Sequence, residues 1–521
     1  MLIVILAFVL RVVNLEKLFY FTYDESIPAF VGRRLILTNH IPLIGGVTPF
    51  GFHLGPYFYW LLALLLYIGK LNPIVWGIAG ALLGSATTFM AYVAGQKFLN
   101  KKAGVTAAVF WAFSFLANLY DRHFWALSWG PIISLIVLFS LHGIIKGNSR
   151  FVYPLAVSVA FGIHADPSNL VFVLLVGLVW AIYKLPITRH TLLATSLIIF
   201  SFLPLVAFDL RHDFANTRPM ISHFKNFSNR QPDQKTLSQR ATDNAIIFPA
   251  AFARLVYTLG DNEVSKQYSY CGNYVAEKTR IIPVYLILLA SSLLTGFALW
   301  GFNQKTKNPA IFISALLLVV YFLGIQLYGT LAKADIFEHY ISGTFAIFLL
   351  ILAKVVSKLP RKLWLVVLAI FVGANLYKLL IATNSHGLTQ KREAIEYVNS
   401  RVGDAPFSLE SVSTCWKYNG YRYLFTVFGK EPVKSYVDPN FAYLYGTTTV
   451  WETHPGTVIA FVTHDFSEET EEFYKRYALL KSHEVSSGIF GNIEVIMMDN
   501  QIKWFDDINT SVKPPSFEQQ R

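Results

Sequence analysis

A long series of apolar segments constrains the fold of this chain more than any other feature. Most of them approach the roughly 18 to 20 residues that a helix needs to cross a bilayer core. Only 15% of the residues are charged, against about 25% in soluble domains. We therefore predict a polytopic α-helical membrane protein. The segments fall at about 1–15, 56–69, 73–96, 103–120, 129–145, 151–165, 168–183, 191–208, 281–302, 309–330, 336–356 and 363–382.

The connectors between these segments separate into two kinds by charge. One kind is short, basic and free of acids, and these connectors are expected to face the cytoplasm. Their basic residues are Lys97, Lys101, Lys102, Lys146, Arg150, Lys184, Arg189, Lys305, Lys307, Lys358, Arg361 and Lys362. The alternate connectors carry acids and histidines and are expected to face outward. The formal net charge of +12 is thus attributed to membrane-flanking loops, and nucleic acid is not expected as a partner.

This alternation of connectors holds only if residues 56–69 do not cross the membrane. That segment is short and aromatic at its start, which fits an interfacial helix. About eleven crossings then remain, with the N-terminus in the cytoplasm and the C-terminus outside. The opening run has no basic segment before it and no small-residue cleavage site after it, so it is interpreted as a span and not as a signal peptide.

Two outward regions are predicted to have structure of their own. Residues 209–280 are too long for a simple connection, and 244–260 is expected to form an interfacial helix. Residues 383–521 have the composition of a small α/β domain, with a helix at 390–404, strands at 457–464 and 492–499, and a disordered tail. Cys271 and Cys415, the only cysteines, both fall on the outward side, where a disulfide is permitted but not required.

The first outer loop, 16–72, begins with FTYDES at 21–26, which places two adjacent carboxylates at the end of the first apolar run. Four further outward stretches deliver acids, imidazoles and guanidinium groups to the same expected level. Such convergence indicates a polar cavity, either a catalytic site or a transport vestibule. Its candidate residues are Asp24, Glu25, His53, Arg122, His123, His164, Asp166, Asp209, Arg211, His212 and Asp213.

The residue types in this predicted cavity suit a particular chemistry. A carboxylate can remove a proton while cations receive a developing anion. Arginine binds phosphate bidentately without a metal. A sugar attached to a lipid phosphate already has a good leaving group, so a single carboxylate acting on the incoming hydroxyl would suffice. Glycosidases need a second acid because an alkoxide leaves poorly.

Several stretches, in order, resemble the GT-C glycosyltransferases. They are FVLRVVNL in the first span, YDES at 23–26, FHLGPYFYWLLALLLYIG at 52–69, LNPIVWGIAGALLGSATTFMAYVAGQKFLNKKAG at 71–104, RHFWALSWGP at 122–131 and PLVAFDLRHDFANT at 204–217. The likeness is to the PMT-type branch, which contains protein O-mannosyltransferases and lipid A aminoarabinose transferases. It covers roughly residues 1–360, and EHYISGTFAIF at 338–348 resembles a late outer stretch without its usual proline.

The resemblance implies a GT-C transmembrane catalytic domain at 1–382 and an extracytoplasmic α/β domain at 383–521. The implied reaction moves a monosaccharide, with inversion, from an undecaprenyl- or dolichyl-type phosphate to an acceptor hydroxyl on a lipid, glycan or protein. It also implies roles for individual residues. Asp24 is the expected base with Glu25 beside it, Arg122, Arg211 and His53 the expected donor-phosphate ligands, and His123, His164, Asp166, Asp209, His212 and His339 the expected acceptor or cavity residues.

No cofactor is implied, because donors with a single phosphate usually need no metal in the resembling families; a divalent cation stays an open alternative.

Simpler roles for the individual site residues are also open. Asp24 would cap a helix or pair with Arg33, and Glu25 would hold Arg34 or a loop amide. Arg122 would pair with Asp121, and Arg211 with Asp209 or Asp213. His53 would only cap the interfacial helix. Two other functions are weighed, a lipid-linked glycan polymerase or ligase and a transporter or flippase. Transport is disfavoured because the centres of the spans carry almost no charge.

Overall fold

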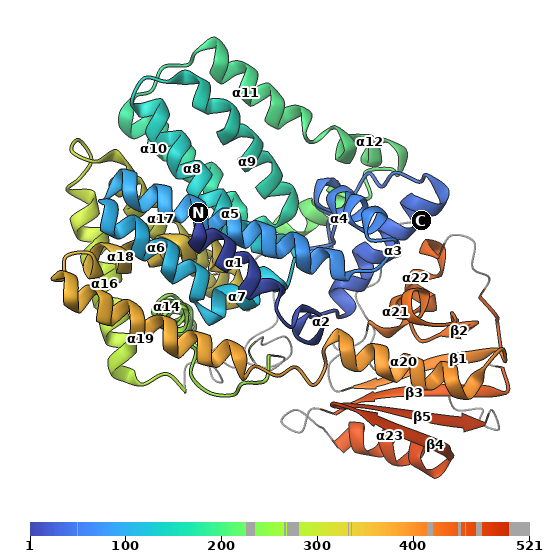
Figure 1. The fold of residues 1–521 in the computed structure, drawn as a ribbon. Coiled ribbons are helices and arrows are strands. Elements are labelled where there is room, and N and C mark those ends of the chain that lie inside the picture. The colour runs from blue at the N-terminus through green and yellow to red at the C-terminus, as the bar shows by residue number, and fades with distance from the viewer. Residues whose placement is uncertain are drawn as a thin grey trace.

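The computed structural model describes residues 1–48, 51–225, 235–264, 267, 281–331, 333–334, 336–413, 420–445, 450–453, 455–464 and 471–499. Figure 1 shows a large helical part and a small sheet-containing part at its lower right. Cys271 and Cys415, and the C-terminal tail, lie outside the described residues.

The helical part contains a helix at each expected apolar segment. Its long helices are α1 (Leu2–Val12), α5 (Ile74–Phe98), α6 (Lys101–Phe113), α7 (Phe115–Arg122), α8 (Gly130–Ile145), α9 (Val152–Ala165), α10 (Leu170–Tyr183), α11 (Arg189–Phe200), α12 (Leu203–Arg211), α14 (Leu237–Val256), α16 (Val284–Phe302), α17 (Pro309–Ile325), α18 (Phe345–Val356) and α19 (Arg361–Leu380). The connecting helices are α2 (Leu15–Leu18), α3 (Tyr23–Thr38), α4 (Tyr57–Ile68) and α13 (Thr217–Lys225). Two 3₁₀ segments, η1 (Ala126–Trp129) and η6 (Glu338–Thr344), precede α8 and α18.

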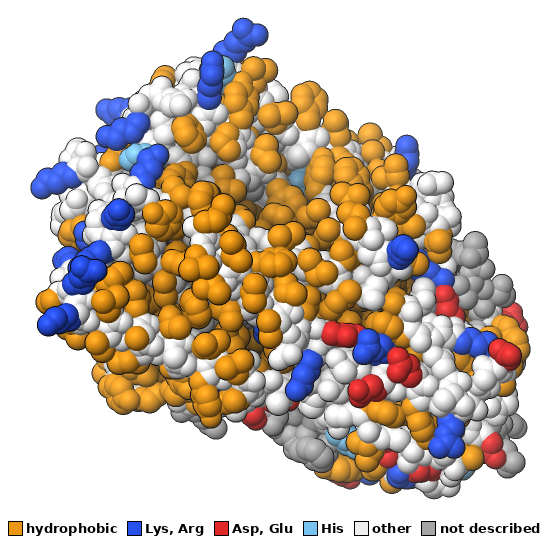
Figure 2. Space-filling model, in the orientation of Figure 1, with side chains coloured by type: hydrophobic (Ala, Val, Ile, Leu, Met, Phe, Trp, Pro, Cys, Tyr) orange, Lys and Arg blue, Asp and Glu red, His pale blue; other side chains and the backbone are white. Residues whose placement is uncertain are grey.

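Seven helices of the described part are long and apolar enough to cross a membrane, and the bent pair α6–α7 brings the number to eight. Helices α1 and α4 and the segment Pro167–Tyr183 are apolar but shorter. Large apolar side chains on the outer helices are exposed, for example Ile199, Leu288 and Ile370, and Figure 2 shows a broad hydrophobic belt across the helical part. The protein is therefore an integral membrane protein.

The basic connectors meet at one end of the helix bundle. Lys102 Nζ donates to the carbonyl of Leu359 at 3.1 Å, and Asn308 Nδ2 donates to that of Phe98 at 2.8 Å. Tyr183 Oη donates to the carbonyl of Lys305 at 2.7 Å. In Figure 2 lysines and arginines line the upper left edge, away from the sheet-containing part. Loops that were grouped by sequence charge alone thus share one side of the molecule.

Helix α14 differs from the expectation for 244–260. It is buried in the bundle against α16 and α18, and Ile247, Ala250 and Leu255 on it have no exposed surface. Its buried residues run without a break from Ile247 to Phe252, so this part of the helix is buried on all sides. The prediction of an interfacial helix here is wrong, because the apolar run fills space between spans.

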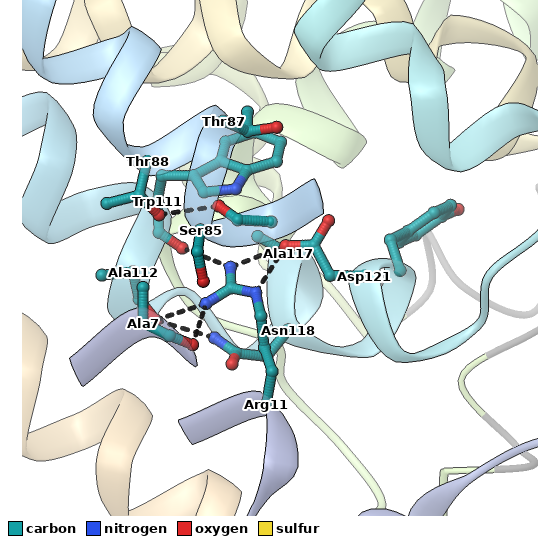
Figure 3. Close-up of polar contacts among 12 residues, drawn as sticks. Ala7, Arg11, Ser85, Thr87, Thr88, Trp111, Ala112, Ala117, Asn118 and Asp121 are labelled. Carbon is teal, nitrogen blue, oxygen red and sulfur yellow. Dashed lines mark hydrogen bonds and ion pairs between the residues drawn. The ribbon is translucent and has the colours of Figure 1, made fainter. Parts of the chain in front are cut away.

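A buried ion pair joins α1 to α7, the helix that follows the bend after α6. Arg11 Nη2 lies 2.6 Å from Asp121 Oδ2, and neither side chain is more than 2% exposed. The two helices are bent by 59°, which leaves carbonyls at the end of α6 without helical partners. Arg11 Nη2 donates to one of these, the carbonyl of Trp111, at 3.2 Å (Figure 3). The expectation that Asp121 would pair with Arg122 is wrong.

The C-terminal part is a five-stranded sheet with helices on both faces. The strands, in the order β2-β1-β3-β5-β4, are β1 (Phe407–Ser413), β2 (Lys434–Ser435), β3 (Thr457–Thr463), β4 (Glu484–Phe490) and β5 (Ile493–Asp499). β1 is parallel to β2 and β3, whereas β5 is antiparallel to β3 and β4. The helices are α20 (Leu388–Val402), α21 (Tyr421–Phe428), α22 (Asp438–Phe441) and α23 (Glu471–Ser482). The expected helix at 390–404 and both expected strands are present.

Alternate residues of β3 enter different cores, as the pleat of a strand requires. Val458 and Val462 pack in a small cluster with Phe473 of α23. Ile459 and Phe461 join a larger cluster that also contains side chains of α3, α4 and α21. The ring of Phe30 on α3 lies 5.0 to 5.5 Å from those of Tyr423, Phe441 and Tyr445. The sheet and the first outer loop therefore share one hydrophobic core.

Candidate functional site

A cavity of about 710 Å³ lies between the first outer loop and the ends of several helices. Its walls come from α3, α4, the 46–55 segment, the α7–η1 turn, the end of α9 and η6. Aromatic and apolar side chains form most of the lining, with a few polar groups, as in small-molecule sites generally. Its polar and aromatic lining includes Tyr23, Asp24, Glu25, Thr48, His53, Tyr59, Trp76, Trp125, His164, Asp166, His339 and Tyr340.

Asp24 and Glu25 reach this cavity because they begin α3. Thr22 and Glu25 form a capping box, in which each side chain bonds the other residue's backbone N–H. The backbone N–H of Thr22 donates to Glu25 Oε2 at 2.7 Å. Carboxylates in the first turn also interact favourably with the helix dipole. The sequence TYDE thus fixes both the start of the helix and the direction of its two acids.

The two carboxylates have different surroundings. Glu25 is 5% exposed, and its carboxylate contacts His123 Nε2 and the Thr22 hydroxyl. Burial acts to raise the pKa of Glu25, but the charge and hydrogen bond of His123 and the bonds from Thr22 outweigh it and leave the pKa below its ordinary value. Asp24 is half-buried and lines the cavity. Both acids therefore border the cavity, Glu25 almost fully buried in its wall and Asp24 more exposed.

His53 lies on the wall formed by the 46–55 segment. Its Nδ1 is 3.1 Å from the carbonyl oxygen of Gly45, and its backbone carbonyl accepts from Asn216 Nδ2 at 3.2 Å. Burial lowers the pKa of His53, partly opposed by the bond to Gly45. The imidazole is therefore neutral at pH 7, with one nitrogen on the backbone and the ring on the cavity lining.

The end of α9 brings His164 and Asp166 to the same cavity. His164 Nε2 lies 2.9 Å from Ser201 Oγ, and its ring packs 5.0 Å from that of Tyr57. Asp166 caps the 3₁₀ turn after α9 by accepting from the backbone N–H of Ser168 at 2.8 Å. Burial raises the pKa of Asp166, and the hydrogen bonds of Ser168 oppose this.

His339 and Tyr340 form the wall contributed by η6. The imidazole of His339 stacks on Phe337 at 5.3 Å and meets Trp125 edge-on at 4.8 Å. Behind this wall Glu338 is buried, and it accepts from Arg254 Nη1 at 2.6 Å and from Tyr120 Oη at 3.1 Å. Glu338 therefore fixes η6 to α14 and α7 and does not line the cavity itself.

Five residues with expected roles in the site do not line the cavity in the described part of the chain, and four of them lie clear of it. Arg122 donates to the carbonyls of Leu10, Arg11 and Val13 and so caps the C-terminal end of α1. Asp209 accepts from Asn216 and Thr217 and organises the turn after α12. His212 bonds the carbonyl of Phe208, and Arg211 is exposed. A phosphate bound in the cavity would therefore contact neither Arg122 nor Arg211.

His123, also expected in the cavity, lies just behind the lining, against Glu25. Trp125, Tyr340 and Tyr59 line the cavity but were not singled out in the sequence. Aromatic residues are too common in this chain, at 16%, for one of them to stand out. Among the lining residues that the structure describes there is no lysine or arginine. Within the same described residues no group of three or more His, Cys, Asp or Glu could hold a metal ion.

No protein family and no curated protein sequence matches the chain. Solved structures do resemble it. ArnT from Cupriavidus metallidurans bound to undecaprenyl phosphate is 12% identical, with a TM-score of 0.46 and coverage of 95% of this chain and 97% of that one. These comparisons also include the oligosaccharyltransferase AglB from Archaeoglobus fulgidus, in complex with an inhibitory peptide and a dolichol-phosphate, at 11% identity, a TM-score of 0.44 and coverage of 96% and 74%.

The arabinofuranosyltransferase AftD from mycobacteria is 14% identical, with a TM-score of 0.37 and coverage of 82% of this chain and 32% of that one. All three are GT-C glycosyltransferases. Because each TM-score is below 0.5, the function proposed next rests on the cavity residues.

Proposed function

We propose that the protein is a membrane glycosyltransferase that moves a monosaccharide from a polyprenyl phosphate to an acceptor hydroxyl, with inversion at the anomeric carbon. The observation that supports this most is the contrast between the two adjacent acids. Both line a cavity large enough for a sugar, where Glu25 is almost fully buried and Asp24 is the more exposed of the two. In this proposal Asp24 is the general base and Glu25 holds it in position.

The proposed reaction breaks the bond between the anomeric carbon and the phosphate oxygen. The acceptor oxygen forms a new bond to that carbon from the opposite face, and its proton passes to Asp24. The electrons of the broken bond stay with the phosphate, which leaves as polyprenyl phosphate. Because phosphate is already a good leaving group, one carboxylate is sufficient, whereas a glycosidase needs two.

The donor phosphate is assigned to hydrogen-bond donors and not to the two arginines expected from the sequence. His53, His164 and His339 are the imidazoles of the described lining. Since His53 uses one ring nitrogen on the carbonyl of Gly45, it donates an N–H to a phosphate oxygen from the other nitrogen only in its protonated form, which the phosphate charge favours. Such donors, fixed before the donor arrives, stabilise the charge that develops on the leaving phosphate. The apolar lining from Phe58, Leu62 and Trp76 suits the first isoprene units.

The orientation in the membrane is part of the same proposal. The basic connectors share one end of the bundle, and short basic loops remain in the cytoplasm. The cavity and the sheet-containing part then face outward, and the N-terminus lies in the cytoplasm. The acceptor approaches from the outer aqueous side and is a lipid, a glycan or a protein.

The test is Asp24→Asn in the full-length protein in lipid vesicles. A panel of polyprenyl phosphates carrying hexoses or pentoses serves as donor, with lipids, glycans and peptides that carry hydroxyls as acceptors, and the release of free polyprenyl phosphate is measured. We expect the rate to fall by about 10²- to 10⁴-fold, as when a general base is removed, while the donor still binds. Asp213→Asn, at an exposed position beyond α12, is the matched control and should keep the wild-type rate. Near-normal release by Asp24→Asn would reject the proposal.

A further inference from the structure

Helix α20 of the C-terminal part contacts the segment that precedes Asp24 and Glu25 in the chain. Arg392 forms an ion pair with Glu16. The backbone N–H of Leu388 donates to the carbonyl of Phe19 at 3.3 Å. At Gly387 a Cβ would lie 2.2 Å from the carbonyl oxygen of Lys17, so the two backbones touch. The contacts cover Glu16 to Phe19 and come from consecutive turns of one helix.

Lys391 of α20 makes the deepest of these contacts. Its side chain has no exposed surface, and its ammonium group donates to the carbonyl oxygen of Phe21. The same group lies 5.5 Å above the ring of Tyr421. Burying a lysine is unfavourable unless it is well bonded. Burial lowers the pKa of Lys391 to about 7, and the nearby charge of Glu25 acts in the opposite direction.

The carbonyl held by Lys391 stands directly before the start of α3. Thr22 follows it and caps the helix, and the capping box joins Thr22 to Glu25. Glu25 in turn contacts His123 on the opposite side. The turn that carries Asp24 is therefore fixed from two directions, from the membrane part through His123 and from the C-terminal part through Lys391.

We infer that Lys391 is a positioning residue for the acidic turn, and that the C-terminal part helps to build the site through it. The inference rests on the proposed function, because it assumes that the direction of Asp24 matters for transfer. It assigns a specific contribution to a region that does not line the described cavity. A displacement of about 1 Å in a catalytic group can lower a rate by about 100-fold, so a fixed carbonyl at Phe21 has kinetic consequences.

The test uses Lys391→Met in the full-length protein. Methionine keeps much of the length and the apolar stem but cannot bond the carbonyl of Phe21. We expect kcat to fall at least about 10-fold, with the KM for the donor changed less than threefold, because the donor-binding walls are untouched. Lys475→Met is the matched control, since Lys475 is an exposed lysine of the same region that pairs only with Glu471 in the described part.

Amide hydrogen exchange gives a readout that does not depend on activity. In Lys391→Met, peptides that cover residues 16–26 should exchange faster, while those around His164 should not change. If Lys391→Met does not fold, Arg392→Met removes a half-exposed contact to the same segment and should give a smaller effect of the same kind. Unchanged exchange at 16–26, or a kcat within twofold of wild type, overturns the inference. A wild-type protein that transfers no sugar rejects the proposed function, while exchange still decides the role of Lys391.

Discussion

His123 Nε2 contacts Oε1 of Glu25, although the two residues are 98 positions apart in the chain. The contact ties the start of α3 to the turn after α7. Both side chains are almost completely buried, so the pair is shielded from solvent. It is the point at which the first outer loop and the helix bundle determine each other's position.

Glu25→Gln should therefore weaken both folding and catalysis. Glutamine keeps the size of the side chain but removes the charge opposite His123, and breaking a buried pair at one partner costs roughly 3 kcal/mol. We expect a lower midpoint of thermal unfolding in detergent and a kcat lower by about 10-fold. Glu471→Gln, at an exposed position on α23, should change neither. A Glu25→Gln protein as stable and as active as wild type would contradict the role given to this pair.

Gly84 of α5 faces the Arg11–Asp121 ion pair, and a Cβ there would lie 2.2 Å from both Arg11 Nε and Asp121 Oδ2. Gly84→Ala should force the pair apart and lower the free energy of unfolding by about 3 kcal/mol. Gly177→Ala on α10 is the control, because nothing lies within 4 Å of its Cβ position. Unfolding in denaturant, followed by tryptophan fluorescence, measures both variants. If Gly84→Ala and Gly177→Ala are equally stable, the Arg11–Asp121 ion pair adapts to the added methyl group without a loss of stability.

The Arg254–Glu338 pair behind η6 allows a double-mutant test. Arg254→Met leaves the buried carboxylate of Glu338 without its cation and should destabilise the protein by roughly 3 to 5 kcal/mol. Adding Glu338→Gln removes that charge, so the double variant should be more stable than Arg254→Met alone. Stability is measured by thermal unfolding in detergent. Strictly additive losses would mean that the two side chains do not act as a pair.

The pKa of Lys391, lowered to about 7 by burial, predicts a pH dependence of stability. Between pH 7 and about 10.4, the ordinary lysine pKa, the unfolded chain binds a proton that the folded protein has released. Stability therefore rises with pH across this window. The wild type should gain stability relative to Lys391→Met as pH is raised from 7 to 10, measured as the difference in unfolding midpoints. The difference in unfolding midpoint between wild type and Lys475→Met should not change with pH. If the difference between wild type and Lys391→Met does not change with pH either, the pKa of Lys391 is not lowered in the folded protein.

Much of the architecture follows from local sequence. Each of the twelve apolar runs contains a helix of the membrane part. The charge of the short loops predicted which loops share an end, because hydrophobicity and charge act residue by residue. The same reasoning predicted that Asp24, His53, His164 and Asp166 would meet. The capping sequence around Thr22 explains why the acids point as they do.

What the sequence did not reveal depends on contacts between distant segments. Arg122 donates hydrogen bonds to the end of α1 because the α6–α7 bend brings the two together. Arg11 forms its ion pair with Asp121 for the same reason. Neither partner can be deduced without the bend angle. The burial of α14 and the contact of Lys391 with Phe21 likewise depend on tertiary packing. An apolar helix looks the same in sequence whether it meets lipid, an interface or another helix.

The core shared by the sheet and α3 has a consequence for biosynthesis. Phe30 and its neighbours on α3 pack against Phe441 and Tyr445, which leave the ribosome long after the early helices have entered the bilayer. Until they arrive, the aromatic face of α3 has no partner from that part. The start of α3 therefore gains its final surroundings only once the C-terminal part has been synthesised, and under the proposed function sugar transfer would begin only then.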